Sequence, residues 1–175
     1  MKGRHVLFDA MAAAPPQAPF WLLAVATAVL AVVLGAIVRV DIRAFRIPDL
    51  LSLPLLAAGL AMAFWRQTIA ATLPADHLIG AIAGYLLLAG IGEAFFRLRG
   101  VEGLGLGDAK LFAAAGAWLG WQSLPLVLLI AAFGGLAQAL VINRGQPAGP
   151  LAFGPWISLG FMAVWLYRLL QLGLV

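Results

Sequence analysis

The sequence contains no cysteine, and histidine is rare, with two residues among 175. A chain without cysteine cannot form disulfide bonds, use a thiolate nucleophile or bind zinc through sulfur. The two histidines, His5 and His77, lie far apart in the chain, so a histidine-based zinc site is not expected either. We expect the protein to use neither a metal ion nor another cofactor.

Charged residues are scarce as well. They make up 10% of the chain, whereas 64% of its residues are hydrophobic; soluble domains average about 25% charged residues. This composition excludes a soluble globular domain and predicts an integral membrane protein, so the lipid bilayer is an expected partner. The net charge of +4 is not gathered in a basic run with interleaved aromatics, which argues against nucleic-acid binding.

Long apolar segments are abundant. Six of them follow one another, at residues 20–38, 50–64, 78–96, 109–121, 124–142 and 151–170. We therefore expect an all-α fold, a polytopic bundle of about six transmembrane helices joined by short loops. Residues 1–19 are predicted to form an N-terminal tail and residues 20–175 one membrane-embedded domain.

Two details of this pattern carry further expectations. Segments 50–64 and 109–121 are short for a full crossing, which predicts a polar notch in the membrane surface. Trp65, Trp118 and Trp121 fall near predicted segment ends, so their side chains are expected at the bilayer interface.

The basic residues predict an orientation. Lys and Arg concentrate in the loops after the first, third and fifth apolar segments, which hold Arg39, Arg43, Arg46, Arg97, Arg99, Lys110 and Arg144. Because cytoplasmic loops are enriched in Lys and Arg, these loops are predicted to be cytoplasmic and the N-terminus external. Asp41 and Asp108 lie two crossings apart, so they are expected on the same face of the membrane.

These two aspartates are the candidate catalytic pair. Asp41 lies in the predicted loop 39–49, and Asp108 follows the alternating glycines of Gly103-Leu104-Gly105-Leu106-Gly107. Two nearby carboxylates share a proton, so one can hold a proton while the other takes one from water. That arrangement can hydrolyse a peptide bond without a covalent intermediate. Glycines would let an extended substrate backbone come close.

A structural alternative exists for each acid. Asp108 would only cap the following helix, and Asp41 would only pair with Arg39 or Arg43. For Asp49, capping of the second helix is the default interpretation. Glu93 and Arg97 are four residues apart, a spacing that predicts a structural ion pair on one helix face.

Three motifs in order resemble those of the prepilin peptidases, the aspartic membrane proteases that process type IV pilin-like precursors. Gly103-x-Gly105-x-Gly107-Asp108-x-Lys110-Leu111 resembles their glycine-rich aspartate motif. Asp41 with Ile47-Pro48-Asp49, Ser52 and Pro54 resembles their first motif, and residues 149–155 resemble the entrance to their last helices. Two positions depart from the family pattern: Leu104 stands where Met is usual, and Ala152 where Pro is frequent.

The resemblance implies that Asp41 and Asp108 are catalytic. It also gives a tentative set of substrate-binding residues within the motifs: Gly105, Gly107, Lys110, Pro48, Asp49, Phe153, Gly154 and Pro155. Longer family members carry an additional N-terminal region with paired cysteines that is associated with N-methylation. This sequence has neither, so a peptidase-only form is expected, similar to the short enzymes of tight-adherence pilus systems, without N-methyltransferase activity.

The expected function is therefore that of an aspartic endopeptidase of the bacterial inner membrane. It would remove the short basic leader of a prepilin or pseudopilin precursor at the cytoplasmic face. One alternative is a presenilin-like intramembrane protease, in which the first aspartate lies inside a helix, often after tyrosine, whereas Asp41 follows Val40 in a predicted loop. Another is a small transporter or channel subunit, which predicts acids near helix centres. The oligomeric state is left open.

Overall fold

The computed structural model describes residues 20–70, 74–101, 103–142 and 152–171. The predicted tail at 1–19 lies outside these residues, as do Arg144 and the first three positions of the motif at 149–155.

Six α-helices and one short 3₁₀ helix make up the described chain, which contains no β-strand. The elements are α2 (Phe20–Ala44), α3 (Asp49–Ala70), α4 (Ala75–Arg99), α5 (Leu106–Leu119), η1 (Trp121–Ser123), α6 (Leu124–Ile142) and α7 (Gly154–Gln171). The all-α prediction with about six helices is confirmed.

Several predicted helix ends were wrong. The predicted loop 39–49 is helical as far as Ala44, so Asp41 lies in the last turn of α2. Arg43 also lies in this turn, where a cation is favourable because it faces the negative end of the helix dipole. The helix stops at Phe45, whose φ of 50° is left-handed, a conformation that an aromatic residue rarely adopts.

Two segments were predicted to be too short for a full crossing, and only one of them is short in the structure. α3 has 22 residues and rises about 33 Å at 1.5 Å per residue, enough to cross a bilayer core. α5 has 14 residues and rises about 21 Å, so only this helix is short. Its first turn includes Asp108, which was predicted to precede it.

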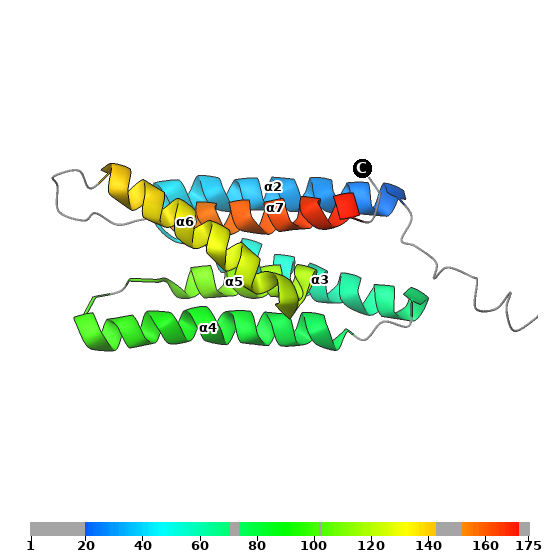
Figure 1. The fold of residues 1–175 in the computed structure, drawn as a ribbon. Helices are drawn as coiled ribbons and strands as arrows, with labels where there is room; N and C mark the ends of the chain where they lie inside the picture. The colour runs from blue at the N-terminus through cyan, green and yellow to red at the C-terminus, as the bar shows by residue number, and fades with distance from the viewer. Residues whose placement is uncertain (1–19, 71–73, 102, 143–151, 172–175) are drawn as a thin grey trace, which may run out of the picture.

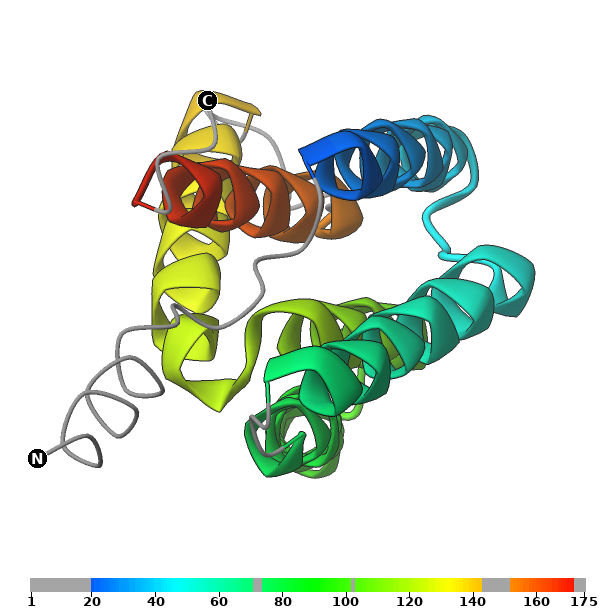
Figure 2. The same ribbon diagram turned by 90° about the vertical axis from the view of Figure 1, so that its right-hand side faces the viewer.

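The helices form two groups (Figure 1). α2 and α7 lie side by side, and α3, α4 and α5 lie together below them, as both views show (Figure 2). α6 runs obliquely from the α7 side to the end of α5. The end of α2, the beginning of α5 and the beginning of α7 come together at one end of the bundle.

α5 is the core of the molecule. Every residue from Leu111 to Leu119 is buried, and small residues let neighbouring helices approach closely. A Cβ on Gly116 of α5 would lie within van der Waals overlap of the Gly80 carbonyl oxygen of α4, so this crossing requires glycine. The short helix is thereby held at a fixed depth between α3 and α4.

Trp118 corrects one sequence prediction. It was expected at the bilayer interface, yet its side chain is buried and its indole N–H donates to the Leu55 carbonyl of α3 over 2.8 Å. Gly59, one turn further along α3, leaves room for the indole ring. Trp65 and Trp121 are exposed, as an interfacial position requires.

Three helical stretches are long and apolar enough to cross a membrane: Trp21–Ala44, Ala75–Arg99 and Trp121–Val141. Most of each stretch is not buried inside the protein, and many large apolar side chains on these helices point outward. Such a surface suits lipid rather than water. The structure is that of an all-α membrane protein, and crossing by α3, α5 and α7 stays a prediction.

Candidate active site

Asp41 is buried in the last turn of α2, with 4% of its surface exposed. Its Oδ2 accepts a hydrogen bond from the Gly154 backbone N–H over 3.0 Å. Gly154 is the first residue of α7, and the first N–H groups of a helix have no partner within it. The beginning of α7 therefore supplies a donor to a carboxylate that belongs to α2.

Asp108 lies in the first turn of α5 and is partly buried. Its Oδ2 accepts the backbone N–H of Gly105 over 3.3 Å, across the start of the helix. Asp108 thus caps α5, as the structural alternative proposed, and its other oxygen remains available. Capping and a chemical role are compatible, because a carboxylate has two oxygens and about four acceptor positions.

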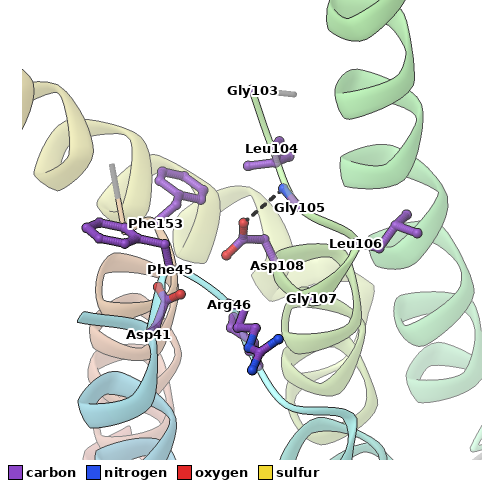
Figure 3. Close-up of a pocket in the computed structure, with 11 residues that line it drawn as sticks. Asp41, Phe45, Arg46, Gly103, Leu104, Gly105, Leu106, Gly107, Asp108 and Phe153 are labelled. Carbon is purple, nitrogen blue, oxygen red and sulfur yellow. Dashed lines mark hydrogen bonds between the residues drawn. The ribbon is translucent and has the colours of Figure 1, made fainter. Parts of the chain in front are cut away.

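The two carboxylates face one cavity of about 340 Å³, Asp41 from α2 and Asp108 from α5 (Figure 3). The cavity is open on one side at the end of the bundle, and its lining comes from the segment after α2, the glycine-rich segment and the residue before α7. The lining residues are Asp41, Phe45, Arg46, Ile47, Gly103, Leu104, Gly105, Leu106, Gly107, Asp108 and Phe153.

The surroundings of Asp108 raise the pKa of its carboxyl group to about 6. The largest cause is burial, which disfavours the charged form, and the negative charge of Asp41 acts in the same direction. The hydrogen bond from the Gly105 N–H opposes both. Asp108 lies outside the three stretches that are long enough to cross a membrane. An acid in this position keeps its proton to a much higher pH than a free aspartate.

The glycines of the motif have different surroundings. A Cβ on Gly107 would lie 3.0 Å from Ile47 Cβ, so a larger residue at this position would force Ile47 to shift. A Cβ on Gly105 would meet nothing closer than 3.6 Å. Gly105 therefore leaves open space beside the cavity, where a bound chain could approach its backbone.

The other predicted site residues divide into two groups. Phe153 lines the cavity. Gly154 does not line it, but its backbone N–H donates to Asp41. Lys110 and Asp49 form an ion pair instead, with Nζ 2.6 Å from Oδ1 and 2.7 Å from Oδ2.

Pro48 and Pro155 stand at helix beginnings. The Pro48 carbonyl accepts the N–H groups of Leu51 and Ser52, and Pro155 is the second residue of α7. Neither proline lines the cavity.

The remaining ion pair among the described side chains joins Arg97 to Glu93 over 2.7 Å, which confirms the predicted helix-face pair. Neither Arg39 nor Arg43 therefore forms an ion pair with Asp41, and that structural alternative was wrong.

The sequence did not single out Phe45, Arg46 or Ile47 as lining residues. All three lie four to six residues after Asp41 in the chain, and the turn that ends α2 brings them to the cavity. Within the described residues, no group of three or more His, Asp or Glu side chains is close enough to hold a metal ion. The cavity presents two carboxyl groups, one of which holds its proton to about pH 6.

Comparison with known proteins identifies the family. Residues 28–140 match the family model described as the type IV leader peptidase family. The chain belongs to the type IV leader peptidase family. The matched stretch includes Asp41, Asp108 and every cavity-lining residue except Phe153.

Curated relatives carry the name prepilin leader peptidase/N-methyltransferase. One from Burkholderia pseudomallei is 50% identical over 128 residues, 71% of this chain and 40% of the relative. Relatives from Aeromonas hydrophila and Escherichia coli are 42% and 45% identical over 88% and 70% of this chain, and over 53% and 54% of their own lengths. This chain thus spans about half the length of the relatives it matches. No solved structure matches it.

Proposed function

We propose that this protein is an aspartic endopeptidase that removes the leader peptide from type IV pilin-like precursors. The observation that carries the proposal is the pair of carboxyl groups, Asp41 and Asp108, facing one open cavity from different helices. The family match and the printed names of its relatives support this reaction and this class of substrate.

The two acids have different roles in the proposed reaction. In the active form Asp108 carries the shared proton, which its raised pKa of about 6 favours relative to a free aspartate, and Asp41 is the ionised partner. A water molecule between them gives a proton to Asp41 as its oxygen attacks the scissile carbonyl carbon. Asp108 donates its proton to the carbonyl oxygen. Asp41 then passes the proton it took from water to the amide nitrogen as the C–N bond breaks, and Asp108 takes back a hydroxyl proton as the new carboxyl group forms.

The cavity suits an extended peptide. Gly105 offers an unobstructed backbone beside the acids, and Phe45 and Phe153 supply apolar surface. The apolar segment of the precursor lies in the bilayer, and its short basic leader stays on the side where Lys and Arg concentrate. We therefore propose that the reaction takes place at the cytoplasmic face of the bacterial inner membrane.

Two alternatives are weaker. The presenilin-like interpretation was set aside because Asp41 was predicted in a loop, and that reason fails because Asp41 lies in α2. The match to the type IV leader peptidase family now argues against it. The transporter interpretation requires acids near helix centres, whereas Asp41 and Asp108 lie in terminal turns.

Leader removal from a co-expressed tight-adherence-type prepilin tests the proposal. Wild type, Asp41→Asn and Asp108→Asn are compared at matched membrane levels. Asp76→Asn, an exposed acid in the first turn of α4 at the opposite end of the bundle, is the matched control. We expect cleavage by wild type and the control and none by the other two. Cleavage by either dyad variant at the wild-type rate would refute the mechanism.

We further propose that cleavage is not followed by N-methylation. The relatives' names include N-methyltransferase. The chain contains no cysteine, whereas the methylating members it resembles carry paired cysteines. Mass spectrometry of the mature pilin is expected to show an unmodified N-terminus, and an added methyl group would contradict this.

A further inference from the structure

The further inference concerns Gly154, which was predicted to bind substrate. The residue does not line the cavity. It lies behind Asp41, and its backbone N–H donates to Asp41 Oδ2 over 3.0 Å, with both residues buried. A residue in this place acts on the carboxylate rather than on the peptide.

The sequence around Gly154 explains why its N–H is available. Phe153 begins the α7 hydrogen-bond pattern, because its carbonyl accepts the N–H groups of Trp156 and Ile157. Pro155 has no N–H. The Gly154 N–H has no partner within the helix, and it reaches the carboxylate of a different helix. The Gly-Pro pair therefore places one donor at the beginning of α7.

Glycine is required here by the closeness of the two helices. A Cβ at position 154 would lie 2.7 Å from Asp41 Oδ2 and 3.0 Å from Ile47 Cδ1. Any side chain would push the carboxylate away from its present position. Gly154 does not have a left-handed backbone, so its φ angle does not call for glycine. Among the described glycines only Gly100 and Gly120 have a positive φ.

We propose that Gly154 is a positioning residue for Asp41, whose carboxylate it fixes through one oxygen so that the other faces the water and Asp108. This inference rests on the proposed function. Positioning of this kind changes the rate of the chemical step rather than substrate affinity, because the contact is made to the enzyme's own base.

The test compares two substitutions in the same helix. Gly154→Ala places a methyl group 2.7 Å from the Asp41 side chain, and Gly160→Ala places one 2.7 Å from the Val127 backbone carbonyl oxygen, a crowding that is at least as severe and lies away from the acids. Each is purified in detergent, and kcat and KM for prepilin cleavage are measured per folded molecule. We expect Gly154→Ala to lower kcat by about 100-fold, the loss that a 1 Å misplacement causes, with KM unchanged. Gly160→Ala should keep the wild-type kcat.

If the Gly154→Ala protein does not fold, a second variant tests the same inference. Cell-free translation can incorporate glycolic acid at position 154, which replaces the backbone amide by an ester and removes the N–H without adding bulk. The same loss of kcat is expected. A wild-type kcat in either folded variant, or a loss confined to KM, overturns the inference.

The outcome is separable from that of the proposed function. Wild type, Asp41→Asn and Asp108→Asn are assayed in parallel. If wild type does not cleave prepilin, or if the aspartate variants do, the proposed function fails. If these three behave as expected and the position-154 variants match wild type, only the role of Gly154 fails.

Discussion

At the scale of single residues, Asp108 combines two properties that oppose each other. Its carboxylate accepts the Gly105 N–H at the beginning of α5, a contact that favours the charged form. Burial and the charge of Asp41 favour the neutral form more strongly, and the pKa is raised to about 6. The protein thus maintains an acid that is costly to ionise at neutral pH.

This cost predicts a stability effect with a definite sign. Between about pH 4 and pH 6 the folded protein binds the Asp108 proton more tightly than the unfolded chain does, so the free energy of unfolding falls as pH rises through that window. Asp108→Asn carries no charge and still offers an oxygen to Gly105. We expect a higher melting temperature than wild type at pH 7, and no such gain near pH 4. Thermal unfolding in detergent measures both.

Asp76→Asn is the control for that experiment. Asp76 is an exposed aspartate at the other end of the bundle whose carboxylate accepts the Trp121 indole N–H, so loss of its charge should give no gain in melting temperature at pH 7. If the melting temperature of Asp108→Asn differs from that of wild type by the same amount at pH 7 and near pH 4, burial of the Asp108 charge does not destabilise the folded protein.

The same group predicts the pH dependence of the reaction. If Asp108 must carry a proton, kcat/KM falls as pH rises above about 6, because the protonated fraction of the free enzyme declines. Asp41 titrates with it as a coupled pair. Cleavage rates of a purified precursor between about pH 5 and pH 8 would give this basic limb. A rate that stays constant through the range would exclude Asp108 as the proton donor.

At the scale of helices and turns, Ile47 sets the geometry of the site. Its side chain is buried against two glycines, Gly107 of α5 and Gly154 of α7, and a Cβ at either position would lie 3.0 Å from it. The side chain therefore separates the beginnings of α5 and α7. Asp108 belongs to α5, and the Gly154 N–H of α7 donates to Asp41. We expect the distance between the two carboxylates to depend on this contact.

Ile47→Ala should therefore affect both stability and catalysis. Loss of the buried side chain is expected to cost about 2 to 4 kcal/mol of stability, and kcat per folded molecule should fall because the helix beginnings can approach. Leu30→Ala, a fully buried position in α2 remote from the cavity, should cost similar stability and keep kcat. Chemical denaturation and the cleavage assay separate the two effects. An equal kcat in both variants would argue against a spacing role.

The sequence predicted the helices well and their ends poorly, for a physical reason. Arg39, Asp41 and Arg43 were assigned to a loop because they are charged. Charged side chains near the end of a helix can reach the membrane surface or a cavity while the backbone stays helical. The length of the apolar segment alone therefore underestimates the length of such a helix. For this reason Asp41 was predicted to lie outside α2.

The candidate catalytic pair was predictable because a glycine-rich aspartate motif is local in sequence. The contacts that arrange the pair were not. Gly154 and Asp41 are distant in the chain, and nothing in either segment indicates that one donates to the other. The Lys110 to Asp49 ion pair was missed for the same reason, since it joins α5 to α3 across the bundle.

At the scale of the whole molecule, all functional features gather at one end. α2 ends there, and the glycine-rich segment, α5 and α7 begin there. Exposed apolar side chains cover the long helices between the two ends. The cavity is therefore expected to open toward one membrane surface, and the distribution of Lys and Arg predicts which compartment it faces.

This orientation can be tested directly because the chain has no cysteine, so each introduced cysteine is a unique label site. Val101→Cys is an exposed position beside the glycine-rich segment, and Ala75→Cys is exposed at the beginning of α4, at the opposite end. If the cavity faces the cytoplasm, a membrane-impermeant maleimide should label Ala75→Cys in intact spheroplasts. It should label Val101→Cys only after permeabilisation. The reverse pattern would place the acids outside, where the precursor's leader could not reach them before export.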